Sequence, residues 1–256
     1  MTGRLADRVG VITGGGGGIG RAGALRFAAE GAALVLLDPD EAAAGGTVAE
    51  IQAAGGAALA LGGDCAAEAD VRAAVGAAVD TWGKLDLLWA NAGIGVSKTV
   101  PVTSLAEWER VVAVNLTGAF LLAKYGIPEL ARAGGGTMVI SGSANSFSAD
   151  RRWAAYCATK GALLMFCKAL ALDHAGDGVR VNIVCPGSVT TPLHELWLRE
   201  HAEGAYDDAL AADTAAHPLG RLGTPQDVAN AALFLSCDES SFITGSSLAV
   251  DGGVTA

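Results

Sequence analysis

A run of five glycines directly after a short apolar segment constrains this chain more than any other feature. Gly14–Gly18 follow Val9–Thr13, and a helical pattern continues from Ile19 and Gly20. Glycine permits the positive φ of a tight strand-to-helix turn, lets the backbone approach a phosphate and allows close helix–strand packing. The N-terminus of the following helix offers unbonded N–H groups to an anion. The run therefore predicts a dinucleotide-binding turn.

The five glycines fit two registers of such a turn. Gly14, Gly18 and Gly20 match G-x-x-x-G-x-G, whereas Gly15, Gly17 and Gly20 match G-x-G-x-x-G. Both registers have the same context, a strand before the turn and a helix after it. The glycines alone leave the choice open.

Short apolar segments alternate with longer Ala-rich segments along the whole chain. Several short segments are apolar at every position, as parallel strands buried between two helix layers are. We predict an α/β fold, a single-domain Rossmann-type doubly wound parallel sheet of about seven strands with helices on both faces, over residues 1–256. The predicted strands are Val9–Thr13, Ala33–Leu37, Ala57–Leu61, Leu85–Ala90, Thr137–Ser141, Val179–Cys185 and Ser247–Asp251. The predicted helices are Gly18–Glu30, Asp40–Ala54, Ala67–Trp82, Leu105–Ala133 and Ala154–Ala175.

One stretch, about 191–218, departs from this alternation. It is polar and mixed, contains no strand pattern and carries three of the four histidines, His194, His201 and His217. Ligands of doubly wound folds bind beyond the carboxyl ends of the strands. We therefore interpret the stretch as a helical excursion that acts as a lid over the ligand edge.

The overall charge argues against several classes of partner. The net charge is −10, which disfavours binding to nucleic acid or to an anionic membrane surface. The five cysteines are odd in number and show no C-x-x-C spacing, so we expect neither a disulfide framework nor a metal site. No targeting segment is evident and no apolar run approaches the length of a membrane span. A cytoplasmic protein is expected.

An acidic residue ends the second predicted strand. Asp38 follows Ala33–Leu37, where a carboxylate accepts hydrogen bonds from the adenosine ribose hydroxyls and repels a 2′-phosphate. Arg21 is a nearby cation that would weaken this preference, and Asp38 also fits as a helix cap before Pro39. Because Asp40 is able to take the capping role, we predict NAD as the cofactor.

A tyrosine and a lysine lie one helical turn apart. Tyr156 and Lys160 share a helix face, so their polar ends point into the same space. A cation beside a phenol lowers the phenol pKa from about 10, which suits it to general acid/base chemistry. The pair alone also fits a solvated helix face.

Further motifs remove that ambiguity. Asn115 lies in a predicted helix where asparagine is unfavourable, and Ser143 lies just past a predicted strand. With Thr13–Gly20, Asp38, Asp64, Asn91-Ala92-Gly93, Tyr156-x-x-x-Lys160, Pro186-Gly187 and Val250–Gly253, the sequence resembles the short-chain dehydrogenase/reductase family over almost its whole length. The resemblance selects the register of Gly14, Gly18 and Gly20. The segment Ser141-Gly142-Ser143 departs slightly from the family, which more often has adjacent serines.

The resemblance implies a role for each matching residue. Tyr156 would be the acid/base, Lys160 would lower its pKa and hold the nicotinamide ribose, and Ser143 would bind the substrate oxygen. Asn115 would hold a water that connects Lys160 to solvent, or would only stabilise the helix and sheet. The implied cofactor contacts are Gly14, Gly18, Ile19, Gly20, Asp38, Asp64, Cys65, Asn91, Ala92, Gly93, Tyr156, Lys160, Pro186, Gly187, Val189 and Thr191.

The implied reaction is transfer of a hydride between NAD(H) and a secondary alcohol or ketone. We expect substrate contacts from Ser143, Asn145, Trp153, Tyr156, His194 and Trp197. Arg151 and Arg152 would meet an anionic substrate group or form a solvated rim. The alternatives are an NADP-linked carbonyl or 3-oxoacyl thioester reductase, and a non-catalytic dinucleotide-binding sensor or scaffold. The resemblance also implies a homotetramer.

Overall fold

A single twisted parallel sheet forms the centre of the molecule. The computed structural model describes residues 3–201 and 205–256. The seven strands follow the order β3-β2-β1-β4-β5-β6-β7, and every neighbouring pair is parallel. The strands are β1 (Val9–Thr13), β2 (Ala33–Asp38), β3 (Ala57–Gly62), β4 (Leu87–Ala90), β5 (Gly136–Ser141), β6 (Val179–Pro186) and β7 (Ser247–Val250).

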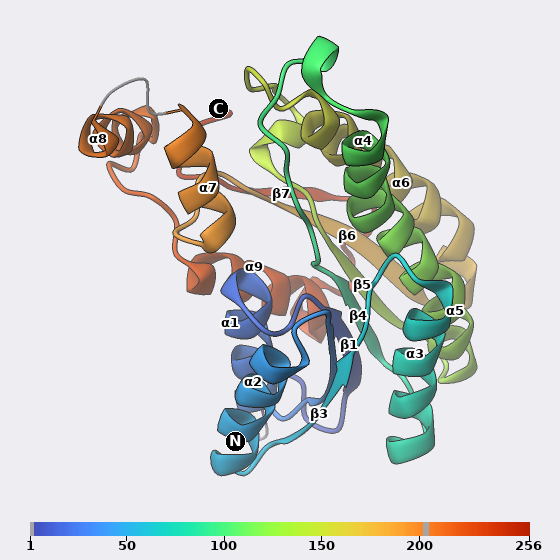
Figure 1. The fold of residues 1–256 in the computed structure, drawn as a ribbon. Coiled ribbons are helices and arrows are strands. Elements are labelled where there is room, and N and C mark those ends of the chain that lie inside the picture. Colours follow the sequence, from blue (N-terminus) through green and yellow to red (C-terminus); the bar gives the residue numbers. More distant parts are fainter. Residues whose placement is uncertain (1–2, 202–204) are drawn as a thin grey trace.

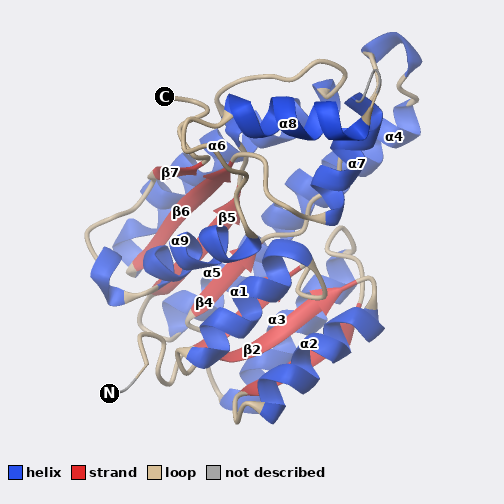
Figure 2. Ribbon diagram, turned by 90° about the vertical axis from the view of Figure 1, so that its left-hand side faces the viewer, coloured by secondary structure: helices blue, strands red, loops and turns tan. Residues whose placement is uncertain are grey.

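Helices cover both faces of this sheet (Figures 1 and 2). The helices α1 (Gly18–Ala29), α2 (Glu41–Ala53) and α9 (Pro225–Ser236) pack on one face. On the other face lie α3 (Glu68–Trp82), α4 (Leu105–Val112), α5 (Gly118–Arg132) and α6 (Ala154–His174). The predicted fold class is confirmed, and the predicted strands are each recovered to within about two residues.

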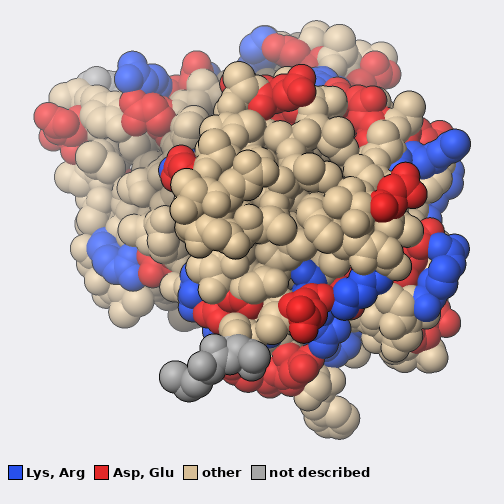
Figure 3. Space-filling view, turned by 90° about the horizontal axis from the view of Figure 1, so that it is seen from below, with Lys and Arg blue, Asp and Glu red and all other residues tan. Residues whose placement is uncertain are grey.

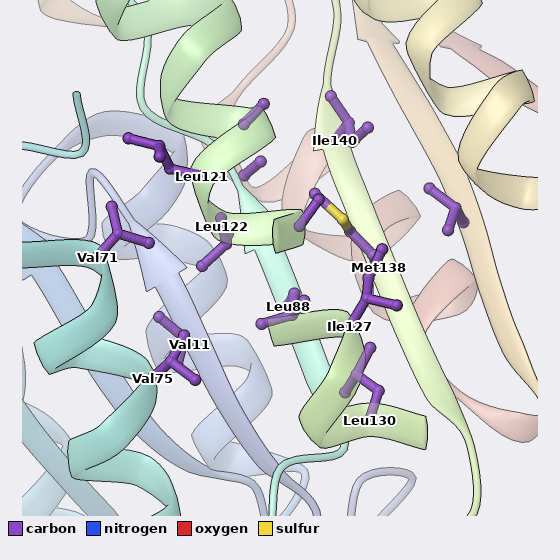
Figure 4. Close-up of a cluster of buried hydrophobic side chains, with 14 of the residues drawn as sticks. Val11, Val71, Val75, Leu88, Leu121, Leu122, Ile127, Leu130, Met138 and Ile140 are labelled. Atoms are coloured by element: carbon purple, nitrogen blue, oxygen red, sulfur yellow. The ribbon is translucent and has the colours of Figure 1, made fainter. Parts of the chain in front are cut away.

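The core between the sheet and α3 and α5 explains the continuous apolar character of the strands. Figure 4 shows Val71 and Val75 of α3 and Leu121, Leu122, Ile127 and Leu130 of α5 facing strand residues. Those strand residues are Val11, Leu88, Met138 and Ile140. The opposite faces of the strands pack on the other helix layer, for example Ile12, Leu36 and Trp89. Strands buried on both faces in this way cannot alternate apolar and polar residues.

The long predicted helix Leu105–Ala133 is interrupted. Residues Ala113–Thr117 form a π-helical turn between α4 and α5, with Asn115 at its centre. Wide turns of this kind are frequently found at functional sites in other helices. The interruption was not predicted, because asparagine is unfavourable in any helix interior and does not by itself specify a wide turn.

Helix α9 is absent from the sequence prediction. It begins with a capping box in which Thr224 and Asp227 bond each other's backbone N–H, and Pro225 occupies the first turn. Thr-Pro-x-Asp is a recognisable helix start. The helix packs against α1 and buries Val228, Ala232 and Leu233 beneath the sheet.

Two helical stretches are long and apolar enough, by length and composition, to cross a membrane. They are Leu105–Arg132 and Ala154–Asp177, with mean hydropathies of 1.4 and 1.3. The expectation that no apolar run approaches this length is therefore wrong. Both stretches pack on the sheet, and 56% and 44% of their apolar windows are buried inside the fold. We interpret them as core helices.

The face of the molecule seen in Figure 3 shows how charge is distributed on one side of the surface. Acidic and basic side chains are interspersed around a broad centre without charged groups (Figure 3). Neighbouring charges of opposite sign attract one another only weakly at an exposed surface, so this pattern adds little to stability. The face carries no continuous basic area among the described residues, which agrees with the excess of acidic residues in the chain.

The predicted excursion contains two helices. These are α7 (Pro192–His201) and α8 (Tyr206–Ala216), which stand beyond the carboxyl ends of the strands, apart from the sheet layers (Figure 1). The excursion starts after Val189 and ends before Gly223, and these two residues form an isolated parallel bridge. The C-terminal turn ends close to these helices.

Candidate active site

One cavity of about 710 Å³ opens at the carboxyl ends of the strands. Its wall starts at the loop after β1, passes the loops after β4, β5 and β6, and continues onto α7, α8 and the C-terminal turn. Strand order reverses between β1 and β4, and ligands of doubly wound sheets bind at such a point. The position agrees with the predicted ligand edge.

The glycine-rich turn forms the floor at one end of the cavity. Gly14 and Gly18 have φ values of +70° and +50°, in the left-handed region. A Cβ on Gly20 would lie 1.8 Å from the Gly14 carbonyl oxygen, so the helix contacts the turn directly. Gly17 precedes α1 without a side-chain cap, and a Cβ at this position would have nothing within 4 Å. The N–H groups at the start of α1 are thus open to an anion.

Asp38 is held beside this turn. Its Oδ2 accepts a hydrogen bond from the Gly16 N–H at 2.9 Å, and its Oδ1 accepts one from the Asp40 N–H at 2.9 Å. A carboxylate has further lone pairs for ribose hydroxyls. Asp40 itself caps α2 through the Ala43 N–H, which is the role considered for it from the sequence. Arg21 points elsewhere and donates to both carboxylate oxygens of Glu50 at 2.6–2.7 Å.

Asp64 and Cys65 do not reach the wall of the cavity. Arg110 and the Ala66 N–H hold the Asp64 carboxylate, and these bonds keep its pKa low despite burial. The Cys65 side chain is buried in the core, near the carbonyl oxygen of Val114. Burial also raises the pKa of its thiol to about 11. The Cys65 side chain therefore serves core packing, and the cofactor contact of this residue stays a prediction.

Asn91 fixes the loop after β4 to the glycine-rich turn. Its Nδ2 donates to the carbonyl oxygens of Thr13 and Gly14, and its Oδ1 accepts from Ser141 Oγ at 3.1 Å. Thr13 Oγ1 accepts the N–H groups of Asn91 and Ala92. Three strand ends are thereby joined, and Asn91, Ala92 and Gly93 line the cavity as predicted.

Tyr156, Lys160 and Ser143 share the middle of the cavity wall. Lys160 is 3% exposed, and its ammonium donates to the Ser141 carbonyl oxygen at 2.6 Å and lies 5.4 Å from the centre of the Tyr156 ring. Ser143 follows β5 and is hydrogen-bonded with Tyr156. The three residues come from two different elements, and the fold gathers them at one point.

Asn115 lies behind this group, buried under the cavity wall. Its Oδ1 accepts from the Ile94 N–H at 2.8 Å, and its Nδ2 donates to Ile94 O and to Thr159 Oγ1, each at 3.0 Å. A Cβ on Gly93 would lie 3.5 Å from Lys160 Nζ and 3.6 Å from Asn115 Oδ1. The π-helical turn thus places the amide next to the lysine, and three protein partners occupy the side chain.

The pKa of Tyr156 differs from the sequence expectation. Burial raises it to about 12, and the hydrogen bond with Ser143 only partly opposes this effect. Burial also lowers the pKa of Lys160 to about 8. The expected lowering of the phenol pKa by its lysine neighbour is not found, because loss of hydration outweighs the attraction between the two groups. Further positive charge in the cavity is needed to make Tyr156 a base.

Apolar and polar groups of the predicted substrate end surround Tyr156. The Trp153 ring meets the Tyr156 ring edge-on, with centroids 5.0 Å apart and an interplanar angle of 88°. Gly95 makes room for it, since a Cβ there would lie 2.1 Å from the indole. The predicted residues Asn145, His194 and Trp197 also line the cavity, and the His194 and Trp197 rings stack at 6.1 Å.

The predicted cofactor contacts after β6 are also placed at the wall. Pro186, Gly187, Val189 and Thr191 line it together with Ile19 of α1. Thr191 Oγ1 accepts from the His194 N–H, so this residue also caps α7.

Several residues of the wall were not predicted from the sequence. Asp213 on α8 accepts from Ser188 Oγ at 2.9 Å, and His194 Nε2 lies 2.7 Å from its other oxygen. The sequence pattern that could have predicted this face of α8 covers only two helical turns. Its residues recur at helical spacing and line the cavity: Ala209, Ala212, Asp213 and Ala216. The other residues of this kind are Ser148, Asp150, Pro192, Leu193, Val254 and Thr255.

Comparison with known proteins identifies the family. A family model described as enoyl-(acyl carrier protein) reductase matches residues 14–255. The chain belongs to the short-chain dehydrogenase/reductase family. It is 42% identical to 2,5-dichloro-2,5-cyclohexadiene-1,4-diol dehydrogenase LinX of Sphingobium indicum, over 99% of this chain and 98% of the relative. It is 40% identical to 2-(S)-hydroxypropyl-CoM dehydrogenase 3 of Xanthobacter autotrophicus, over 100% of both chains.

A solved structure gives the same result for the fold. The 3-ketoacyl-(acyl-carrier-protein) reductase of Brucella melitensis, complexed with NADH, superposes with a TM-score of 0.88 at 36% identity. The alignment covers 98% of this chain and 100% of that chain. This short-chain dehydrogenase/reductase is an oxidoreductase that acts on CH–OH groups of small molecules and uses a nicotinamide dinucleotide.

Proposed function

We propose that the protein is an NAD-dependent alcohol dehydrogenase that interconverts a secondary alcohol and its ketone, with Tyr156 as the general acid/base. The observation that carries this proposal is the meeting of Ser143, Tyr156 and Lys160 at the wall of one cavity, next to the glycine-rich turn. A binding protein without chemistry has no need of a phenol, a hydroxyl and a buried ammonium at the same point. This complete set argues against the sensor or scaffold.

The cavity fits the proposed cofactor. Open N–H groups at Gly17 and Gly18 would hold the pyrophosphate, and the loops of Asn91–Gly93 and Pro186–Thr191 would flank the adenosine and carboxamide ends. Asp38 supports NAD over NADP, because its charge would repel a 2′-phosphate. Arg21 does not counter that charge, since Glu50 neutralises it. For Asp64 we retain only a proposed position facing the adenine.

The bound nicotinamide would supply the hydride acceptor and, when oxidised, a positive charge beside Tyr156. That charge favours the phenolate and opposes the effect of burial on the Tyr156 pKa. The phenolate then accepts the hydroxyl proton of the alcohol, while Ser143 Oγ holds the same substrate oxygen. In the opposite direction, the phenol donates its proton to the carbonyl oxygen.

Lys160 and Asn115 would renew the proton on Tyr156. Lys160 is an ammonium below a pH of about 8 and would hold the nicotinamide ribose from the cavity wall. The Asn115 side chain already has three protein partners. We therefore assign the relay water to the backbone of the π-helical turn.

We further propose that the segment 191–218 is a lid over the cavity and that the protein acts in the cytoplasm.

Exposed apolar side chains on α5 and α6 support the proposed homotetramer. Phe120, Met165 and Leu172 are 47%, 63% and 82% exposed. Light scattering of the purified protein tests this assembly, and a monomer at micromolar concentration would contradict it.

The test of the function is a panel of secondary alcohols and ketones assayed by NADH absorbance, with NAD and NADP in parallel. We expect alcohol oxidation with NAD and reduction of the matching ketone with NADH. A clear preference for NADP would instead support the carbonyl or 3-oxoacyl thioester reductase. Tight NADH binding without turnover of any member of the panel would support the sensor.

A further inference from the structure

The charged side chains around the substrate end of the cavity are predominantly acidic. Two carboxylates, Asp150 and Asp213, line the cavity. Among the described residues, no arginine lines it and the one lysine is Lys160. The three residues between the described segments, 202–204, are Ala, Glu and Gly, so they add no basic side chain. A negatively charged substrate group would therefore need another source of positive charge.

Lys160 does not provide it. This residue is 3% exposed, and its ammonium donates to the Ser141 carbonyl oxygen at 2.6 Å and belongs to the proposed acid/base group. A substrate anion bound directly to it would occupy the place of the reacting oxygen.

The two histidines at the wall do not provide it either. His194 Nε2 lies 2.7 Å from Asp213 Oδ2, and both side chains are less than one-tenth exposed, so any charge on this imidazole is balanced by its neighbour. His217 Nε2 accepts a hydrogen bond from the Ser188 N–H at 3.2 Å, while its Nδ1 lies 2.8 Å from the Asp213 carbonyl oxygen. These two partners require a neutral imidazole with its proton on Nδ1. The Ser188 hydroxyl also donates to Asp213.

The two arginines nearest to Asp150 in sequence, Arg151 and Arg152, do not line the cavity. Arg152 donates to the carbonyl oxygens of Ser97 and Glu200 and lies 3.6 Å from the Glu200 carboxylate. Of the two roles considered for this pair, contact with an anionic substrate is not supported.

Asp150 belongs to the same cavity wall as Tyr156 and Ser143. It is exposed at the cavity wall, and its negative charge adds to the raised pKa of Tyr156. A negative charge on a substrate held at Tyr156 and Ser143 would share the cavity with Asp150. Repulsion between two such charges in a partly dehydrated cavity weakens binding by one to two powers of ten.

We propose that this cavity selects alcohols without a negative charge and that Asp150 is the residue that determines this selectivity. The inference rests on the proposed function and specifies its substrate class: uncharged secondary alcohols whose apolar body packs on Trp153 and Trp197. Alcohols that carry a carboxylate, sulfonate or phosphate near the reacting carbon are excluded.

The test compares two ring compounds of the same shape. Cyclohexanecarboxamide and cyclohexanecarboxylate are titrated calorimetrically into the full-length protein at pH 7, with and without NADH. We expect the amide to bind about 30-fold more tightly than the carboxylate. In Asp150→Asn, the carboxylate should gain about 10-fold while the amide stays within about 2-fold. Asp150→Ser should give the same pattern and guards against a local effect of the amide side chain.

The matched control is Asp80→Asn, which removes the same charge from the exposed surface of α3. It should leave both affinities within about 2-fold, because screening removes interactions of distant exposed charges. Equal affinity of the wild type for both compounds, tighter binding of the carboxylate, or no binding of the amide would overturn the selectivity proposal. This test measures binding, so its outcome can be distinguished from failure of the proposed function. Failure of the proposed function would appear as absent turnover of the alcohol panel.

Discussion

The Lys160 ammonium lies 5.4 Å from the centre of the Tyr156 ring, and burial lowers its pKa to about 8. Burial therefore works against the charged form of the lysine and against the phenolate at once. In the proposed reaction, the positive charge of the oxidised nicotinamide would favour the phenolate, which the protein alone does not stabilise.

The buried lysine predicts an unusual dependence of stability on pH. Between a pH of about 8 and its ordinary pKa of 10.5, the unfolded chain binds a proton at Lys160 that the folded chain does not. The free energy of unfolding therefore rises with pH in this window. From pH 8 to 10, the wild type should gain about 2 kcal/mol relative to Lys160→Met.

Urea unfolding at both pH values measures this difference. Lys168→Met, at an exposed position of the same helix, is the control and should track the wild type. If the difference in free energy of unfolding between the wild type and Lys160→Met stayed constant from pH 8 to 10, the lowered pKa of Lys160 would be contradicted.

The glycine-rich turn predicts opposite results for two neighbouring glycines. Gly20→Ala places a Cβ 1.8 Å from the Gly14 carbonyl oxygen, which forces the helix and the turn apart. We expect a loss of about 2 kcal/mol in the free energy of unfolding. Gly17→Ala meets nothing within 4 Å and has an extended φ of −151°, so it should unfold like the wild type. Equal stabilities of the two variants in urea would refute this packing.

We expect the Asp38 carboxylate to determine the preference for NAD over NADP. Asp38→Ser removes the charge that would repel a 2′-phosphate and should reduce the ratio of kcat/KM for NAD to that for NADP at least ~10-fold. Asp40→Ser is the control, since that carboxylate caps α2 through Ala43. If Asp38→Ser left the ratio unchanged, Asp38 would have no part in the choice of cofactor.

The bond between His194 and Asp213 predicts the behaviour of the lid. It joins α7 to α8, and Ser188 joins the same carboxylate to the loop after β6. Asp213→Ala should raise the rate of proteolytic cleavage within 191–218 by about 5-fold, because local opening becomes less costly. Asp207→Ala, at an exposed position in the first turn of α8, should cleave at the wild-type rate. Unchanged cleavage of Asp213→Ala would show that other contacts hold the lid.

Local sequence patterns were sufficient for much of the fold and of the site. Buried strands, the glycine-rich turn and the Tyr156/Lys160 spacing depend on residues close together in the chain. The direction of the Cys65 side chain could not be predicted locally, because its neighbour Asp64 lies on the surface while the Cys65 side chain turns into the core. Asp213 was missed because its partners His194 and Ser188 are brought to it only by the path of the excursion.

The pKa of Tyr156 illustrates a second limit of prediction from the sequence. The spacing to Lys160 indicates attraction between the charges, but the extent of dehydration depends on the whole cavity wall. In the fold, Trp153 and the loop carrying Ser143 cover the phenol, and dehydration dominates. Similarly, α9 has a clear start signal at Thr224, whereas the π-helical turn at Asn115 arises from its contacts with Ile94 and Thr159.

The substitution Tyr156→Phe tests whether Tyr156 transfers the proton in the proposed reaction. Tyr156→Phe keeps the ring that packs on Trp153 and removes only the hydroxyl. With NAD and the best alcohol of the panel, kcat should fall by at least ~100-fold, while the affinity for NADH, measured by fluorescence titration, stays within about 3-fold. Near-normal turnover by Tyr156→Phe with intact NADH binding would contradict the account.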